Sequence, residues 1–289
     1  MFINRKVKKF AVNIERTMAI NAISFSIAFL FVLVILFASN HFSFATPIHL
    51  AVLGAISILA SQVCIMKAVE LGSVTITSLF INGNFIIPTI FGSIYYRETV
   101  HFLQIIGIVV MLISFAIGVE KEDGKSFNFK WLFCVIGGIV STGLLGIVQK
   151  IYGIEYSSKY SLDSFFAVSF LIIVAISLAV SLICYAQRKT KNKLAVNTEV
   201  KISWLDKKSL IITLFLGLVL GYHNKFCTYL SGVLPSALYF PIINGGVIVL
   251  VAVASAILFK EKLNKRQILS TLIGFVSIIL ISIGKLLLG

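Results

Sequence analysis

The stretch SVTITSLFINGNFIIPTIFGSIY, residues 73–95, decides the fold, because it is 23 residues long, largely apolar and free of charge. A helix that rises 1.5 Å per residue needs about 20 such residues to cross the ~30 Å hydrocarbon layer of a membrane. Similar stretches recur along the chain, in which 58% of the residues are hydrophobic and only 12% are charged. These properties predict an integral membrane protein rather than a water-soluble domain.

Nine membrane-spanning helices are predicted, with almost no soluble domain. Their ranges are 17–38, 48–67, 73–95, 101–119, 131–150, 163–185, 209–230, 234–258 and 266–288. Each range is continuously apolar, whereas a strand of a membrane β-barrel alternates apolar and polar residues. The expected fold class is therefore an all-α integral membrane protein.

Lysine and arginine are shared unevenly between the two sides of the membrane that successive loops would occupy. Nineteen lie on the side of the N-terminus, and four, Arg97, Lys150, Lys159 and Lys285, lie on the other. Because basic loops are retained in the cytoplasm, this predicts a cytoplasmic N-terminus, an external C-terminus and a cytoplasmic loop over 187–208. The net charge of +14 is explained by these loops and by anionic lipid, so no nucleic-acid partner is expected.

The two halves of the chain resemble each other. The charged turn YYRETVHFLQ, residues 95–104, returns 163 positions later as LFKEKLNKRQ, residues 258–267. Other pairs at this offset are Cys64 with Cys227, Gly83 with Gly246, Glu98 with Glu261, Gln104 with Gln267 and Ser114 with Ser277. Glu98 is expected to form an ion pair with its neighbour Arg97 at the membrane interface.

The similarity continues upstream with a changed offset, since AISFSIAF at 22–29 resembles AVSFLIIV at 167–174. This leaves four helices in the first repeat, residues 1–120, and five in the second, residues 121–289. The pattern predicts a ten-helix arrangement of two repeats from which the first helix is missing. An odd number of helices per repeat inverts one repeat against the other, which places a site near the bilayer midplane.

The segment AVELGSVTITSLFINGNFIIPTIFGSIYYRE, followed by LQIIGIVVMLISFAIG, resembles the half-repeat of the drug/metabolite transporter superfamily, EamA type. The matching positions are Ala68, Gly72, Pro88, Glu98, Gly107 and Gly118 in the first half and Pro235, Glu261, Gly274 and Gly284 in the second. The resemblance implies a carrier that moves a small solute by alternating access around a central cavity, rather than an enzyme. Members usually have both termini in the cytoplasm, which differs from the orientation that the charges predict.

Polar residues inside the predicted spans are the candidates for a substrate site, since such groups are costly to bury in lipid. They are Gln62, Asn82, Asn84, Asn224, Lys225 and Asn244. Glycine and proline are expected to interrupt two helices, at FINGNFIIP, residues 80–88, and at FPIINGG, residues 240–246, which is typical of transporter sites. Close helix packing by the same glycines and amides stays an open alternative.

Lys225 is expected to face the cavity without a buried acid as a fixed partner, and so to favour an anionic, zwitterionic or amino-acid-like solute. The alternative is that its amine extends to the lipid headgroups, and the same alternative applies to Gln149 and Lys150 near a helix end. Lys67 and Glu70 are expected to form an ion pair at the interface.

Two other functions stay open: a proton-coupled exporter of cationic or drug-like compounds, and a truncated membrane fragment that does not transport. The exporter is less favoured, because no carboxylate is predicted deep within a span and Asp163 is placed in a loop. The scattered histidines and cysteines predict no metal site and no cofactor. The expected partners are a small-molecule substrate and the lipid of the cell (plasma) membrane, with a homodimer as an open alternative to a monomer.

Overall fold

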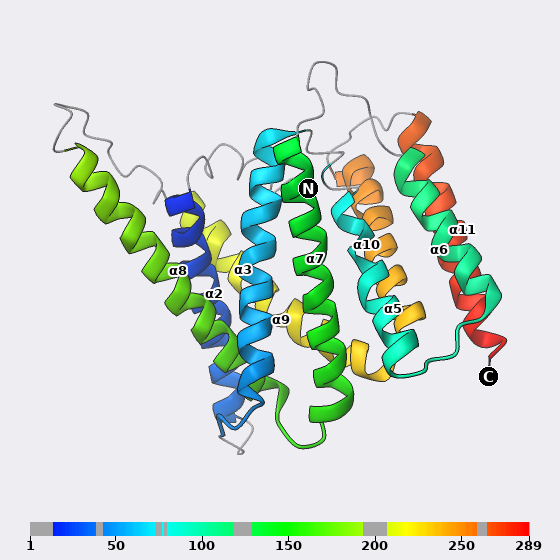
Figure 1. Ribbon diagram of the computed structural model, residues 1–289, viewed down its shortest axis with the longest axis horizontal. Helices are drawn as coiled ribbons and strands as arrows, with labels where there is room; N and C mark the ends of the chain where they lie inside the picture. The colour runs from blue at the N-terminus through cyan, green and yellow to red at the C-terminus, as the bar shows by residue number, and fades with distance from the viewer. Residues whose placement is uncertain are drawn as a thin grey trace. The chain divides into compact units, whose positions relative to one another are not determined.

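The computed structural model describes residues 14–38, 43–72, 77, 80–117, 129–192, 207–258 and 265–288. All regular elements in these residues are helical (Figure 1). They are α2 (Ile14–Ala38), α3 (Ile48–Leu71), η1 (Gly83–Phe85), α5 (Ile86–Tyr95), α6 (Phe102–Ile117), α7 (Phe129–Ile151), η2 (Tyr152–Tyr156), α8 (Leu162–Asn192), α9 (Lys207–Val233), α10 (Ser236–Leu258) and α11 (Lys265–Leu286). Six of the described helical segments are long and apolar enough to cross a membrane, so the chain is an all-α membrane protein.

Three expectations about the helices are corrected. The helix α8 continues to Asn192, so residues 187–192 are helical rather than part of a loop; lysine, arginine and glutamine favour helix, and cations are favourable near a helix C-terminus. Asp163, placed in a loop by the sequence, lies in the first turn of α8. The helix α10 runs unbroken through Pro241 and the glycines that follow it, so only one of the two expected interruptions is observed.

The chain forms two compact units, and each draws helices from both halves of the sequence. One unit contains residues 1–56 and 155–229, and the other contains residues 57–154 and 230–289. The helix α3 is shared between them. The first unit is therefore built chiefly from α2, α8 and most of α9, and the second from α5, α6, α7, α10 and α11.

In the first unit, α2 and α8 lie side by side (Figure 1). The rings of Phe25 and Phe170 contact each other with centroids 5.5 Å apart. The helix α9 approaches α2 at Gly217, where an added Cβ would lie only 2.5 Å from the backbone oxygen of Ser24. Small residues permit such close contacts between membrane helices, which gain little from the hydrophobic effect among lipid tails.

In the second unit, α6 and α11 lie side by side and run antiparallel (Figure 1). The start of α6 meets the end of α11, where Gln104 lies against Gly284. Towards the other end, Ser114 Oγ donates a hydrogen bond of 2.7 Å to the carbonyl of Ser270, and Ser270 Oγ donates one of 2.8 Å to the carbonyl of Ser114. These reciprocal bonds fix the register of the two helices.

The helix α5 contacts both α7 and α10 in the same unit. Gly143 and Gly146 of α7 allow this approach, because an added Cβ would lie 2.6 Å from a methyl group of Ile87 or 2.9 Å from the ring of Pro88. On the side of α10, an added Cβ at Gly92 would overlap the hydroxyl of Ser236. The helices α5, α7 and α10 are therefore close enough for the backbone of one helix to contact side chains of the next.

A methyl group at Gly107 is expected to destabilise the contact between α6 and α11. The added Cβ would lie 2.5 Å from a methylene carbon of Ile281 and 3.0 Å from the backbone oxygen of Ser277. Overpacking of this kind costs about 1–3 kcal/mol, so Gly107→Ala should lower the Tm of the purified protein.

Gly246→Ala is the matched control, because a Cβ at Gly246 would meet nothing within 4 Å. Alanine favours helix more than glycine does, so the control should leave the Tm unchanged or raise it slightly. Equal Tm values for the two variants, measured by tryptophan fluorescence on heating, would contradict the described packing of α6 on α11.

Candidate functional site

One of the two expected helix interruptions is present in the structure, directly before α5. Residues 80–82 are α-helical, Gly83–Phe85 form the tighter 3₁₀ turn η1, and α5 begins at Ile86. The Ile86 N–H donates to the carbonyl oxygens of Gly83 and Asn84. Pro88 contributes to the break, since it has no N–H for the carbonyl four residues before it.

Three asparagine side chains are associated with this break. Asn82 and Asn84 are half-buried, and among the described residues their side chains make no hydrogen bond. Asn244 on α10 is also half-buried, and its Nδ2 donates to the carbonyl of Phe240 at 2.9 Å, which leaves its amide oxygen available. The three amides therefore retain hydrogen-bonding capacity within a membrane-spanning unit.

The register of α5 and α10 brings these amides to the same level. The two helices run antiparallel: Gly92 lies against Ser236, and one turn away Pro88 and Phe240 both lie against the same glycine of α7. One further turn along each helix places Asn84 at the level of Asn244. The helix α10 also contacts η1 directly.

Open space accompanies the amides. An added Cβ at Gly83 would meet nothing within 4 Å, and the same is true of Gly246. In contrast, an added Cβ at Gly92 or Gly146 would be within 3 Å of its neighbours. The second unit is thus tightly packed at one end of α5 and roomy beside η1, where the amides lie.

Lys225 has a fixed acidic partner, so the expectation of an unpaired cation is wrong. Its Nζ donates to Oδ1 of Asp163 at 2.6 Å, and the pair links α9 to the first turn of α8 within the first unit. The Lys225 side chain is 30% exposed and that of Asp163 is 13% exposed, so the pair is partly shielded. The reason for the error is that Asp163 was placed in a loop.

The other two candidates differ in their surroundings. Asn224 is buried in the first unit, and its Nδ2 donates to the carbonyl of Leu220 at 2.9 Å in the same helix. Gln62 on α3 is half-buried in the second unit. The structure thus brings Asn82, Asn84 and Asn244 together in one unit, and Asn224 and Lys225 belong to the other.

Lys150 forms a buried polar cluster that the sequence did not predict. Its side chain is only 2% exposed, so extension to the headgroups is wrong for this residue. Its Nζ lies 2.7 Å from Oε1 of Glu98 and donates to the carbonyl of Leu234 at 2.8 Å. The other carboxylate oxygen of Glu98 accepts a hydrogen bond of 2.7 Å from the N–H of Ser236.

Glu98 reaches this cluster because of the turn after α5. Arg97 has a φ of 53°, in the left-handed region, and the Glu98 N–H donates to the carbonyl of Gly92 at 3.5 Å. The chain thereby folds back on the end of α5 and directs Glu98 towards α7 and α10. The ion pair expected between Glu98 and Arg97 is replaced by the pair with Lys150. By contrast, the expected pair of Lys67 and Glu70 is confirmed, at 2.9 Å.

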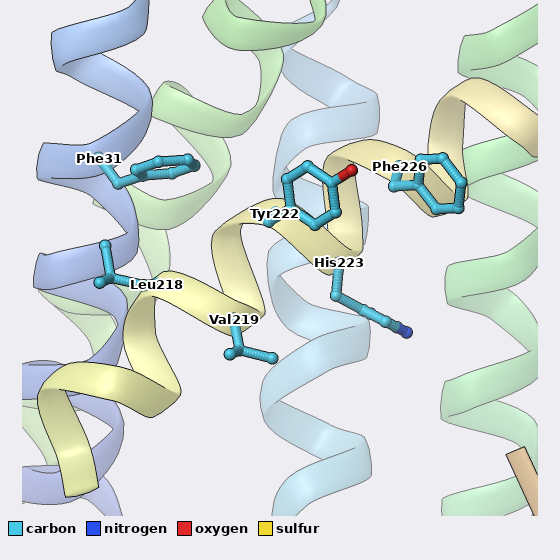
Figure 2. Close-up of a pocket in the computed structure, with 6 residues that line it drawn as sticks. All are labelled: Phe31, Leu218, Val219, Tyr222, His223 and Phe226. Atoms are coloured by element: carbon cyan, nitrogen blue, oxygen red, sulfur yellow. The ribbon is translucent and has the colours of Figure 1, made fainter. Parts of the chain in front are cut away.

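The first unit contains an open apolar hollow of about 490 Å³ (Figure 2). Phe31 of α2 lines it together with five residues of α9, Leu218, Val219, Tyr222, His223 and Phe226. None of the six sequence-predicted candidates lines this hollow. Its aliphatic and aromatic surface is typical of a helix face exposed to lipid.

No group of three or more histidine, cysteine, aspartate or glutamate side chains that could hold a metal ion occurs among the described residues. The four cysteines, all of them in described helices, form no disulfide. The polar clusters described above consist of amides and of lysine–carboxylate pairs.

The described helices define a multi-pass, all-helical membrane protein, and comparison with known proteins gives its family. The family model of the EamA-like transporter family matches residues 5–118 and 129–283. The chain belongs to this family and is a membrane transporter. No curated protein matches it.

Solved structures support the fold. Twenty-seven chains match, and one of them, titled only as the crystal structure of a protein, has a TM-score of 0.72. The alignment covers 98% of this chain and 91% of that chain at 11% sequence identity. At this identity the similarity extends to the fold alone.

Removal of the Lys225 charge is expected to destabilise the first unit, because Asp163 would lose its partner at 2.6 Å. Lys225→Met should lower the free energy of unfolding by about 1.5–3 kcal/mol, the usual range for hydrogen bonds to charged groups. The double variant Lys225→Met/Asp163→Asn should recover part of the loss, since no charge is left unpaired. Additive losses in thermal unfolding would show that the two side chains do not interact.

Proposed function

We propose that the protein carries a small polar solute across the cell membrane by alternating access, with Asn82, Asn84 and Asn244 as the hydrogen-bonding groups of the site. The observation that carries this proposal is the break of the helix at η1, where three amides with free hydrogen-bonding capacity lie beside open space. A broken helix with exposed backbone and polar side chains is tolerated at membrane depth where it lines a cavity.

An inverted repeat is part of the proposal, with residues 1–120 and 121–289 as its two copies. At the offset of 163, Ser270 corresponds to Gly107 and Ser277 to Ser114. Ser114 contacts Ser270 and Gly107 contacts Ser277, so each contact has its counterpart. Such reciprocity is typical of a two-fold axis, and between antiparallel helices that axis lies in the plane of the membrane. Phe25 and Phe170, equivalent at the offset of 145, also contact each other.

The chemistry of the site favours a neutral or zwitterionic solute that can accept and donate hydrogen bonds. Asparagine offers both donors and acceptors without net charge. The expectation of an anionic, zwitterionic or amino-acid-like solute rested on an unpaired Lys225, and that side chain is neutralised by Asp163, so the site no longer offers a net positive charge. An amino-acid-like zwitterion therefore fits the proposed site better than a simple anion.

Replacement of the amides is expected to reduce transport. In proteoliposomes, radiolabelled alanine and serine serve as zwitterionic probes and radiolabelled glycerate as an anionic probe. Each of Asn82→Ala, Asn84→Ala and Asn244→Ala should lower the initial rate of uptake of a zwitterionic probe by about two- to tenfold, because one lost hydrogen bond costs about 0.5–1.5 kcal/mol.

Ser282→Ala provides the control for polar deletion, since Ser282 Oγ bonds only to the carbonyl of Ile278 in its own helix α11. Its uptake rate should equal that of the unchanged protein. Full uptake by the three asparagine variants would exclude these amides from the site. Uptake of glycerate but of neither amino acid would contradict the zwitterionic substrate class.

The orientation is also part of the proposal: the segment 193–206 faces the cytoplasm and the segment around Ser43 faces outwards, from the unequal distribution of basic residues. In a chain without native cysteines, Ser43→Cys should react with a membrane-impermeant maleimide added to intact cells. Asn197→Cys should react only after the cells are opened. The reverse result would place the N-terminus outside.

A further inference from the structure

The cluster of Lys150, Glu98, Leu234 and Ser236 joins elements of the two proposed repeats. Glu98 follows α5 in the first repeat, whereas Lys150 ends α7 and Ser236 begins α10 in the second. Within the second unit, we propose that this cluster is a gate: the buried Lys150–Glu98 pair closes one end of the path between α5 and α10, and opening requires the pair to break. This inference rests on the proposed transport by alternating access.

The geometry fits a closed gate because both charged side chains of the cluster and the N–H group at the start of α10 are paired. Glu98 accepts from Lys150 at 2.7 Å with one oxygen and from the Ser236 N–H at 2.7 Å with the other. Lys150 in turn donates to the carbonyl of Leu234. The first N–H groups of a helix have no partner within it, so the carboxylate also satisfies the start of α10.

The surrounding contacts show that this end of α5 and α10 is shut. Gly92 lies so close to Ser236 that an added Cβ would overlap its hydroxyl, and would come within 2.8 Å of Oε2 of Glu98. Thr89, one turn before Gly92, is 7% exposed, and its Oγ1 lies 3.5 Å from the Ser236 carbonyl. No such closeness occurs at Gly83, beside the proposed site.

A gate explains the ion pair better than static packing does. A buried pair often adds little to stability over apolar residues of the same volume, because two charges must be taken out of water. A buried ion pair does separate a closed arrangement, in which the two charges are paired, from an open one, in which water must hydrate both charges. Alternating access requires such a choice at the point where the repeats separate.

The test measures how often the closed end opens, by labelling a buried reporter. The chain is first freed of its native cysteines, Cys64, Cys134, Cys184 and Cys227. Thr89→Cys is then introduced as a near-isosteric reporter behind the gate, and the purified protein in lipid nanodiscs is treated with a small charged methanethiosulfonate. Glu98→Gln in this background should raise the labelling rate roughly tenfold or more, as expected if the open state is a minor population that the pair suppresses.

Glu70→Gln is the matched control, because it removes the same charge from the same compact unit. Its partner Lys67 lies in the same helix, so this pair does not join the repeats, and the labelling rate should stay that of the parent. The double variant Glu98→Gln/Lys150→Met should be labelled as fast as Glu98→Gln. Because it leaves no unpaired buried cation, it also serves as the test if the single variant folds poorly.

An unchanged labelling rate in Glu98→Gln and in the double variant would overturn the gate. A lower Tm without faster labelling, measured well below the Tm, would also overturn it and assign the pair to stability. Labelling needs no transport substrate, so failure of the gate is distinguishable from failure of the proposed transport. The equivalent Glu261 lies outside the described residues, and the inference concerns Glu98 alone.

Discussion

Hydrocarbon offers a peptide group no hydrogen-bond partner, and this constraint shapes every part of the structure that lies in the membrane. Helices satisfy it within each segment, which is why the described elements are helical. Once the backbone is satisfied, the helices gain most from close contact at small residues. Gly107, Gly143 and Gly217 provide such contacts. The break at η1 departs from this continuous α-helical pattern, as does the π-helical turn η2.

The positions of the helices could be predicted from the sequence, whereas the partners of the charged residues could not. Hydropathy is a local property, so ranges such as 101–119 and 131–150 agree with α6 and α7 to within two residues. The pair of Lys67 and Glu70 was predictable because both residues lie on one helix face. Lys225 and Asp163 are 62 positions apart, and only the tertiary fold brings this part of α9 to the first turn of α8.

Glu98 shows the same limit at a turn. Its neighbour Arg97 offered the obvious partner, but the left-handed conformation of Arg97 turns the carboxylate towards Lys150 instead. A positive φ at a non-glycine residue cannot be foreseen from residue type. The helix break at η1, in contrast, was predictable. The Asn-Gly-Asn sequence and Pro88 indicated it correctly, because both act on the local backbone. Pro241 lies in the second turn of α10, and the helix continues through it.

The second unit is tightly packed at the end of α5 and has an open Cβ position at Gly83, before the start of α5, and this contrast has a mechanistic consequence. At Gly92 the helices are in contact and a buried ion pair joins them, whereas an added Cβ at Gly83 would meet nothing within 4 Å. Packed contacts do not stretch gradually, so the contact between α5 and α10 at this end is either intact or broken. Release exposes Lys150 and Glu98 to water, which repays part of the cost of parting them. A solute bound at the proposed asparagine site would influence that choice only if it interacted more strongly with one arrangement of α5 and α10 than with the other. Because η1 lies at the start of α5 and Glu98 follows its end, one short helix would connect a solute at the proposed site to the ion pair.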